Sequence, residues 1–224
     1  MFTETDRAQV AAAISAAEAG TSGEIVCIVS ETRHAYTGFA LGIALFAASL
    51  VPLAAVILGV DFNALLPGAE WSSGDATLDL RHGIEAYAAV QALLFVVIAA
   101  LLTLTRLGHW LVPRFVRHHR VHSAALTQFR ARGIADTRAH TGVLIYVDSA
   151  DRIAEVVADS GIYAKVSPSY WRTTVDALLR GLRAGTPAQG FVDAVALAGA
   201  VLAEHFPARS SDNPNELPDR LIVL

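Results

Sequence analysis

The chain is poor in residues that provide cross-links and reactive side chains. A single cysteine, Cys27, excludes an internal disulfide. Cys27 lies in an apolar strand pattern without a basic neighbour that would lower its pKa. We therefore interpret it as a small buried hydrophobic residue rather than a nucleophile. The only lysine, Lys165, lies in a predicted loop, where solvation is its expected role.

The chain also lacks the short motifs that identify common enzymes. It contains no phosphate-binding loop, no dinucleotide fingerprint, no Gly-x-Ser-x-Gly nucleophile elbow and no calcium loop with EF-hand spacing. The formal net charge is only -4, and the basic residues gather in one short segment rather than over a broad surface. A general nucleic-acid binder needs many phosphate contacts, so we expect no nucleic-acid partner.

Two long stretches, residues 37–60 and 86–105, lack any formally charged side chain. As helices they would extend about 36 Å and about 30 Å, and the hydrocarbon core of a bilayer is roughly 30 Å thick. Both are apolar on all sides, so a hairpin buried in a soluble core would need complete enclosure, which 224 residues can hardly provide. The sequence therefore predicts a transmembrane hairpin joined by a loop at 61–85, with the lipid bilayer as a partner.

Arginines are distributed unequally on the two sides of this hairpin. The loop contains one basic residue, Arg81, beside five acidic residues. Five arginines lie on the opposite side: Arg33, Arg106, Arg114, Arg117 and Arg120. The positive-inside rule then predicts a multi-pass protein of the bacterial inner membrane with both termini in the cytoplasm. Trp71 and Trp110 would anchor the hairpin at the two interfaces.

Local patterns outside the hairpin predict both strands and helices. Three apolar, β-branched runs are typical of buried strands: 24–30, 141–148 and 152–159. A basic helix is expected at 113–132. Helix ends are indicated by these capping signals: Thr3 with Asp6, Gly20, Gly133, Ser167 before Pro168, Gly185, and Thr186 before Pro187.

These elements predict one small domain of the α/β class that is interrupted rather than divided. We expect an α/β sandwich assembled from residues 1–35 and 113–206, with helices packed on a sheet. The transmembrane segment 36–112 is inserted between the two parts. Residues 207–224 contain several prolines and asparagines, so we expect a flexible, extended tail there.

Several motifs, taken in order along the chain, resemble the TPM domain family. They are Thr21-Ser22-Gly23-Glu24-Ile25-Val26 on the first strand, Thr141-Gly142-Val143-Leu144-Ile145-Tyr146-Val147 on the second, Asp151-Arg152 at the turn, and Gly161 after the third strand. The family includes thylakoid-lumen proteins linked to photosystem II repair and many bacterial membrane proteins. The resemblance implies an α/β sandwich, with acid-phosphatase activity or calcium binding as candidate functions.

Acidic side chains gather around the predicted hairpin of the second and third strands. Asp148, Asp151 and Asp159 offer the oxygen ligands that calcium or magnesium prefers, and Asp151 matches the turn position of the family. We therefore predict a metal site at these three residues. The alternative is that Asp148 and Asp159 merely end strands, and that Asp151 supports the turn through its own backbone hydrogen bonding.

The helix after Pro113 begins with a cluster of basic residues. Five of them are expected to contact anionic lipid headgroups: Arg114, Arg117, His118, His119 and Arg120. The alternative is a metal ion shared by His118 and His122, which lie four residues apart on one helix face. No acidic or cysteine partner follows at ligand spacing, and the neighbouring arginines would repel a cation.

Three classes of function remain open. The preferred one is a membrane-anchored accessory module that binds another protein, a second copy of itself, or a divalent cation. The second is a metal-assisted phosphatase, in which Asp148 and Asp151 hold a cation that polarises a phosphoryl oxygen. The third is an oligomeric channel or transporter component. Gln91, the only strongly polar side chain of the second span, is too little for a transport pathway and is expected to bond between helices or protomers.

Overall fold

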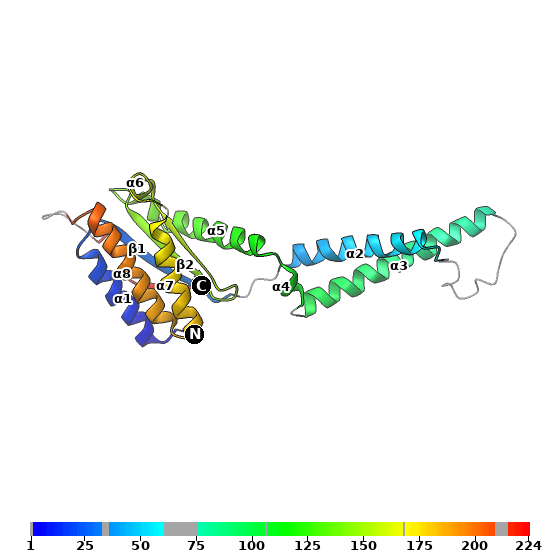
Figure 1. Ribbon diagram of the computed structural model, residues 1–224, viewed down its shortest axis with the longest axis horizontal. Helices are drawn as coiled ribbons and strands as arrows, with labels where there is room; N and C mark the ends of the chain where they lie inside the picture. The colour runs from blue at the N-terminus through cyan, green and yellow to red at the C-terminus, as the bar shows by residue number, and fades with distance from the viewer. Residues whose placement is uncertain (1, 33–35, 61–75, 106, 168, 209–214) are drawn as a thin grey trace. The chain divides into compact units, whose positions relative to one another are not determined.

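The computed structural model describes residues 2–32, 36–60, 76–105, 107–167, 169–208 and 215–224. The chain folds into two compact units, one made of Met1–His34 with Arg114–Leu224 and the other of Ala35–Pro113 (Figure 1). The first unit is a mixed α/β domain, and the second contains the two long apolar helices. An α/β domain interrupted by a helical hairpin is therefore confirmed.

The α/β domain is built on a four-stranded sheet with the order β3-β2-β1-β4. Its strands are β1 (Glu24–Ser30), β2 (Gly142–Asp148), β3 (Ile153–Ala158) and β4 (Leu221–Val223). β1 runs parallel to both β2 and β4, whereas β3 is antiparallel to β2. The three strands predicted from apolar runs are confirmed within a residue or two at their ends.

The fourth strand corrects the prediction of a flexible tail over residues 207–224. Leu221–Val223 pairs with Cys27–Val29, and the N–H of Leu224 donates to the Val29 carbonyl oxygen at 2.9 Å. The prediction relied on the prolines and asparagines between residues 207 and 218, and it overlooked the short apolar run that follows. That run covers the edge of β1, whose backbone would otherwise present unpaired hydrogen-bonding groups.

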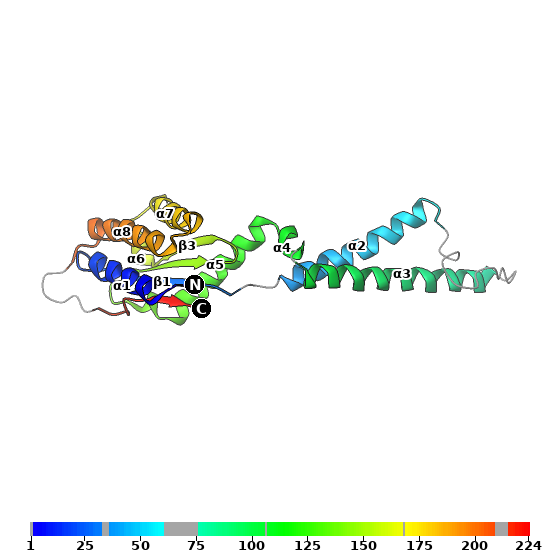
Figure 2. The same cartoon turned by 90° about the horizontal axis from the view of Figure 1, so that it is seen from below.

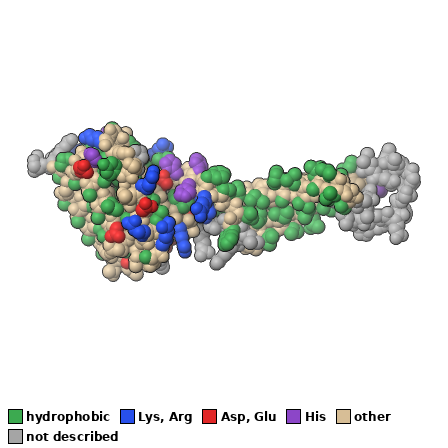
Figure 3. Space-filling model, in the orientation of Figure 1, with side chains coloured by type: hydrophobic (Ala, Val, Ile, Leu, Met, Phe, Trp, Pro, Cys, Tyr) green, Lys and Arg blue, Asp and Glu red, His purple; other side chains and the backbone are tan. Residues whose placement is uncertain are grey.

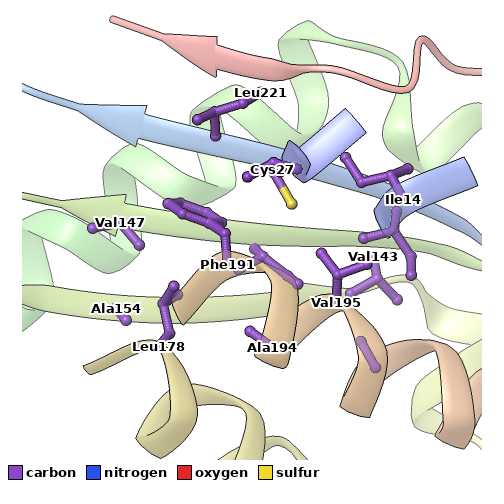
Figure 4. Close-up of a cluster of buried hydrophobic side chains, with 14 of the residues drawn as sticks. Ile14, Cys27, Val143, Val147, Ala154, Leu178, Phe191, Ala194, Val195 and Leu221 are labelled. Carbon is purple, nitrogen blue, oxygen red and sulfur yellow. The ribbon is translucent and has the colours of Figure 1, made fainter. Parts of the chain in front are cut away.

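One face of the sheet is covered by α1 (Glu4–Glu18), α7 (Tyr170–Ala184) and α8 (Pro187–His205), with α8 in contact with both others (Figure 2). Alternate sheet residues point toward these helices. Figure 4 shows Phe191 of α8 among buried side chains of the sheet and α7. Cys27 is fully buried here, and burial raises the pKa of its thiol, so its prediction as a small hydrophobic residue is confirmed.

The opposite face is covered by α5 (Arg114–Ala131) and the short 3-10 helix η2 (Ile134–Asp136). Val121, Ala125 and Phe129 form the buried stripe of α5. They pack on the sheet residues that point away from α8: Val26, Ile28, Leu144, Tyr146, Ile153 and Val157. The sheet therefore lies between two helical layers, which explains why β1 and β2 are buried along their whole length.

Three predicted helix ends are confirmed. Thr3 and Asp6 form a capping box: the Asp6 N–H donates to Thr3 Oγ1 at 3.1 Å, and the Thr3 N–H donates to Asp6 Oδ2 at 2.8 Å. The Thr3 bonds lower the pKa of the Asp6 carboxyl. Gly133 after α5 and Gly185 after α7 adopt left-handed backbone conformations, with φ of 67° and 77°.

Three other capping predictions are wrong in detail. α1 ends at Glu18 with Ala19 as its right-handed C-cap, so Gly20 lies beyond the cap. α7 begins at Tyr170 after Ser169 and not directly after Ser167, whose hydroxyl instead contacts Ser169 Oγ at 3.0 Å. α8 begins at Pro187 as predicted, but the Thr186 side chain makes no capping hydrogen bond.

The second unit contains α2 (Thr37–Ile57), α3 (Ala76–Leu104) and the short α4 (Leu107–Leu111). Thr37–Ile57 and Arg81–Leu104 are long and apolar enough to cross a membrane. The second helix begins about ten residues earlier than predicted, so only 61–75 of the expected loop remains, and these residues, with Trp71, lie outside the described part of the chain.

α2 and α3 pack against each other through small residues. The buried stripe of α2 consists of Ala40, Ala44, Ala48 and Pro52. Gln91 Nε2 of α3 donates to Ser49 Oγ of α2 at 3.2 Å, which confirms that the amide bonds between the helices. Large apolar side chains such as Phe46 and Val96 remain exposed on the hairpin, with exposed fractions of 67% and 61%. This unit therefore has an apolar exterior, unlike the α/β domain.

Candidate functional site

The carboxyl ends of the parallel strands β1 and β2 form the first candidate site. Ser30 and Asp148 are register partners at this edge, and both side chains are buried. Ligands of α/β proteins commonly bind where parallel strands end. Tyr146 lies two residues before Asp148 on the same strand, and its side chain hydrogen-bonds to Ser30. A serine, a tyrosine and an aspartate therefore meet at the strand ends.

Asp148 and Asp151 lie together in the turn that joins β2 to β3. Asp148 Oδ1 accepts a hydrogen bond from the Asp151 N–H at 2.9 Å. Arg152 follows in a left-handed conformation with φ of 54°. This bond resembles the turn support that was the alternative interpretation, because an aspartate that accepts from a nearby N–H stabilises a turn. The Asp148 carboxylate thus contacts the backbone of Asp151 at the carboxyl end of β2.

Asp159 does not belong to this group, so the structure does not bring the three predicted metal ligands together. In the β2–β3 hairpin Asp148 pairs with Ile153, whereas Asp159 follows Ala158 at the other end, about 20 Å away along the strands. Asp159 caps α6 (Ser160–Tyr163) and contacts His140 Nδ1 at 3.3 Å through Oδ2. Among the described residues, no group of three or more His, Cys, Asp or Glu side chains could hold a metal ion.

The positive charge of Arg120 on α5 acts on Tyr146, near the carboxyl ends of β1 and β2. Burial raises the pKa of Tyr146, the hydrogen bond with Ser30 opposes this, the charge of Asp148 raises the pKa further, and the charge of Arg120 lowers it. Arg120 is thus close enough to the sheet to stabilise an ionised phenol. The same positive charge reduces the affinity of Asp148 for a cation.

The outer face at the start of α5 is the second candidate site. Arg114, His118 and His119 are exposed, Arg117 is half-buried, and the Phe115 side chain is 73% exposed. Figure 3 shows basic and histidine side chains gathered on this face of the domain. The first turn of α5 contains no acidic residue. A helix N-terminus itself carries partial positive charge. Together with the arginines, this charge makes the start of α5 suited to anions.

The structure adds an acidic partner to the histidines of α5. His122 Nδ1 lies 2.8 Å from Glu155 Oε1 on β3. The sequence separates the two residues by 33 positions, so spacing arguments could not find the pair. Glu155 is reachable because it occupies a position of β3 that points toward α5, between Ile153 and Val157.

A third group of acidic residues lies at the opposite edge of the sheet and was missed from the sequence. Glu18 Oε1 accepts from the Ile25 N–H at 2.6 Å, and the Glu24 carboxylate accepts from the N–H groups of Glu216 and Leu217 at 3.3 Å and 3.2 Å. Burial raises the pKa of Glu18 to about 8, the Ile25 bond opposes this, and the charges of Glu24 and Asp219 add to it. Burial likewise raises the pKa of Glu24.

Most of the residues on which the family resemblance rests stabilise the starts of β1 and β2. Thr21 Oγ1 donates to the Phe206 carbonyl oxygen at 2.6 Å, and Thr141 Oγ1 donates to that of Ser22 at 3.0 Å. A Cβ at Gly142 would lie 2.3 Å from the Ile134 carbonyl oxygen. A Cβ at Gly161 would lie 2.5 Å from that of His140. These positions require small or hydrogen-bonding residues for packing reasons.

The architecture defines a class of small α/β domains with one antiparallel strand on an otherwise parallel sheet. Residues 110–201 match the family model described as the TPM domain. The resemblance to that family is therefore confirmed for this part of the chain.

A solved structure supports the same fold. It is the NMR structure of the BA42 protein from the psychrophilic bacterium Bizionia argentinensis, which is 20% identical, with a TM-score of 0.58. The match covers 100% of this chain and 96% of BA42. No curated protein matches the chain. At this identity the likeness to BA42 concerns the fold alone.

Proposed function

We propose that the protein is a membrane-anchored accessory module whose cytoplasmic TPM domain contacts anionic lipid headgroups through the start of α5. In this proposal α2 and α3 cross the bacterial inner membrane, and both termini face the cytoplasm. One observation carries it: an exposed basic face with no acidic residue in its first turn begins ten residues after the last residue of α3. As an accessory module, the protein would also bind a protein partner or a second copy of the chain. Cross-linking in membranes tests for either.

The physical chemistry of α5 favours a lipid surface over other anions. Each basic residue close to an anionic membrane contributes about 1 kcal/mol of attraction. The arginines are accompanied by exposed apolar side chains, Phe115 within α5 and Trp110 four residues before Arg114, with exposed fractions of 73% and 89%. Aromatic side chains prefer the headgroup region, whereas a soluble anion would gain nothing from them.

Hydrogen exchange in nanodiscs tests the lipid contact. The N–H groups at the start of α5 are expected to exchange about tenfold more slowly in anionic than in zwitterionic lipid, because headgroup contacts suppress local opening. The Arg114→Gln/Arg117→Gln variant should lose that difference. A charge-matched control, Arg130→Gln/Arg138→Gln, removes two exposed arginines elsewhere and should keep it. Equal exchange of the wild-type protein in both lipids would contradict the contact.

The carboxyl edge supports a second candidate, a calcium or magnesium site that assists phosphate-ester hydrolysis. The supporting observation is the contact between the carboxylate of buried Asp148 and the N–H of half-buried Asp151, next to Tyr146, where two parallel strands end. A cation held there would polarise a phosphoryl oxygen. This proposal concerns two carboxylates and not the three that the sequence predicted.

Calorimetric titration of calcium, then magnesium, tests this second candidate. The wild-type protein is expected to release or absorb heat with one of the ions, and the Asp148→Asn/Asp151→Asn variant should not. Asp136→Asn, an exposed acid away from the turn, is the matched control. Hydrolysis of an aryl phosphate should then be lost in Asp151→Asn. Absence of heat with both ions in the wild-type protein would contradict the proposed metal site.

A further inference from the structure

The outer face of α5 carries two histidines in an arrangement that suits a transition metal. His118 and His122 lie four residues apart, so their Cβ atoms are about 5–6 Å apart on one side of the helix. Both residues are exposed. The same i, i+4 spacing presents two imidazoles to zinc in helical metal-binding motifs. Spacing alone is weak support, because any exposed helix can carry such a pair.

The contact between His122 and Glu155 supplies the second observation. Metal-bound histidines commonly donate the ring N–H that does not face the metal to a carboxylate, which fixes the tautomer and the ring orientation. His122 Nδ1 lies 2.8 Å from Glu155 Oε1, and the Glu155 side chain is only 27% exposed. When Nδ1–H donates to Glu155, Nε2 of His122 keeps its lone pair as a ligand.

We propose that His118 and His122 bind a zinc-like transition-metal ion through their imidazole nitrogens, with Glu155 orienting His122 and water completing the coordination. Imidazole ligands favour Zn²⁺, Co²⁺, Ni²⁺ or Cu²⁺ over Ca²⁺ and Mg²⁺, which prefer oxygen. This site is separate from the carboxylates Asp148 and Asp151. Only two protein ligands take part, and the charges of Arg114 and Arg117 oppose the cation, so binding is weaker than at a closed four-ligand site.

The test is a Zn²⁺ titration of the full-length, untagged protein in detergent, repeated with Co²⁺ for its visible absorption. One ion per chain is expected. His118→Ala and His122→Ala should each weaken binding at least tenfold, whereas His119→Ala, which alters an adjacent exposed histidine on another face, should bind as the wild type does. His118→Ala leaves the His122–Glu155 contact intact, so its loss of binding cannot come from a loosened α5.

The Glu155→Gln variant tests whether Glu155 orients His122 for metal binding or only forms an ion pair with it. Loss of an outer carboxylate typically weakens metal affinity by about 10–100-fold, so this variant should bind Zn²⁺ that much more weakly at an unchanged stoichiometry. Unaltered affinity in Glu155→Gln would overturn the role of Glu155. Equal losses in His118→Ala and His119→Ala, or no binding by the wild-type protein, would overturn the site itself.

Discussion

Phe191→Ala is expected to destabilise the α/β domain by about 4 kcal/mol, because it removes the largest fully buried side chain of the core. Phe191 belongs to the cluster that joins α1, α7 and α8 to the sheet (Figure 4). Its ring packs edge-to-face on Phe2, with centroids 5.9 Å apart. The aromatic pair is lost together with the buried area, and the surrounding helices can collapse only partly into the resulting cavity.

Trp171 provides a local probe for this experiment. It is buried in the same cluster, and Trp71→Phe/Trp110→Phe would make it the only tryptophan. Unfolding of the detergent-solubilised protein by urea, followed by Trp171 fluorescence, gives the free energy of unfolding. Leu197→Ala, at a 38% exposed position of the same helix, should change this free energy by less than about 1 kcal/mol. A similar loss in both variants would mean that Phe191 is not a core residue.

Glu18→Gln is expected to stabilise the domain at alkaline pH and to flatten its dependence on pH. The pKa of Glu18 is about 8 in the folded chain against 4.5 as its ordinary value. The folded protein therefore holds a proton between these values that the unfolded chain releases, so stability is greatest below pH 4.5 and falls as the pH rises toward 8. Above that pH the folded state contains a buried carboxylate beside Glu24 and Asp219.

Glutamine keeps the shape of neutral Glu18 and can still accept from the Ile25 N–H. After allowance for solvent screening, Glu18→Gln should exceed the wild type by on the order of 2 kcal/mol at pH 9 and match it near pH 4. Glu204→Gln, an exposed acid on α8, should follow the wild-type profile. A residual slope is expected from Glu24, whose pKa is raised in the same direction. Parallel profiles for the wild type and Glu18→Gln would contradict the assignment.

The sequence was sufficient for elements whose signals are local. β1 and β2 are buried on both faces and therefore read as continuous apolar runs, and Thr3 with Asp6 forms a capping box from neighbouring residues. The apolar helices α2 and α3 are recognisable by length and composition alone. The class of fold and the interruption of the domain followed from these signals.

Contacts that depend on strand register could not be predicted. The register places Asp148 beside Ser30 and removes Asp159 to the far end of the hairpin, although the three acids looked equivalent in sequence. Strand β4 joins β1 across most of the chain. The His122–Glu155 contact depends on which face of β3 meets α5. Each of these contacts depends on which strands are neighbours in the sheet. Local periodicity of the sequence does not contain that information.

The insertion of the helical hairpin has a consequence for the order of folding. β1 is synthesised early, but its parallel neighbour β2 follows more than a hundred residues later, and β4 later still. Because synthesis runs from the N-terminus, the two apolar helices emerge before β1 has any strand to pair with. Such non-local pairing slows folding, and the apolar Glu24–Ser30 segment stays exposed to chaperones and to aggregation meanwhile. The sheet can pair β1 with β2 only after the whole hairpin has been synthesised, so the insertion sets a minimum time for which β1 stays unpaired.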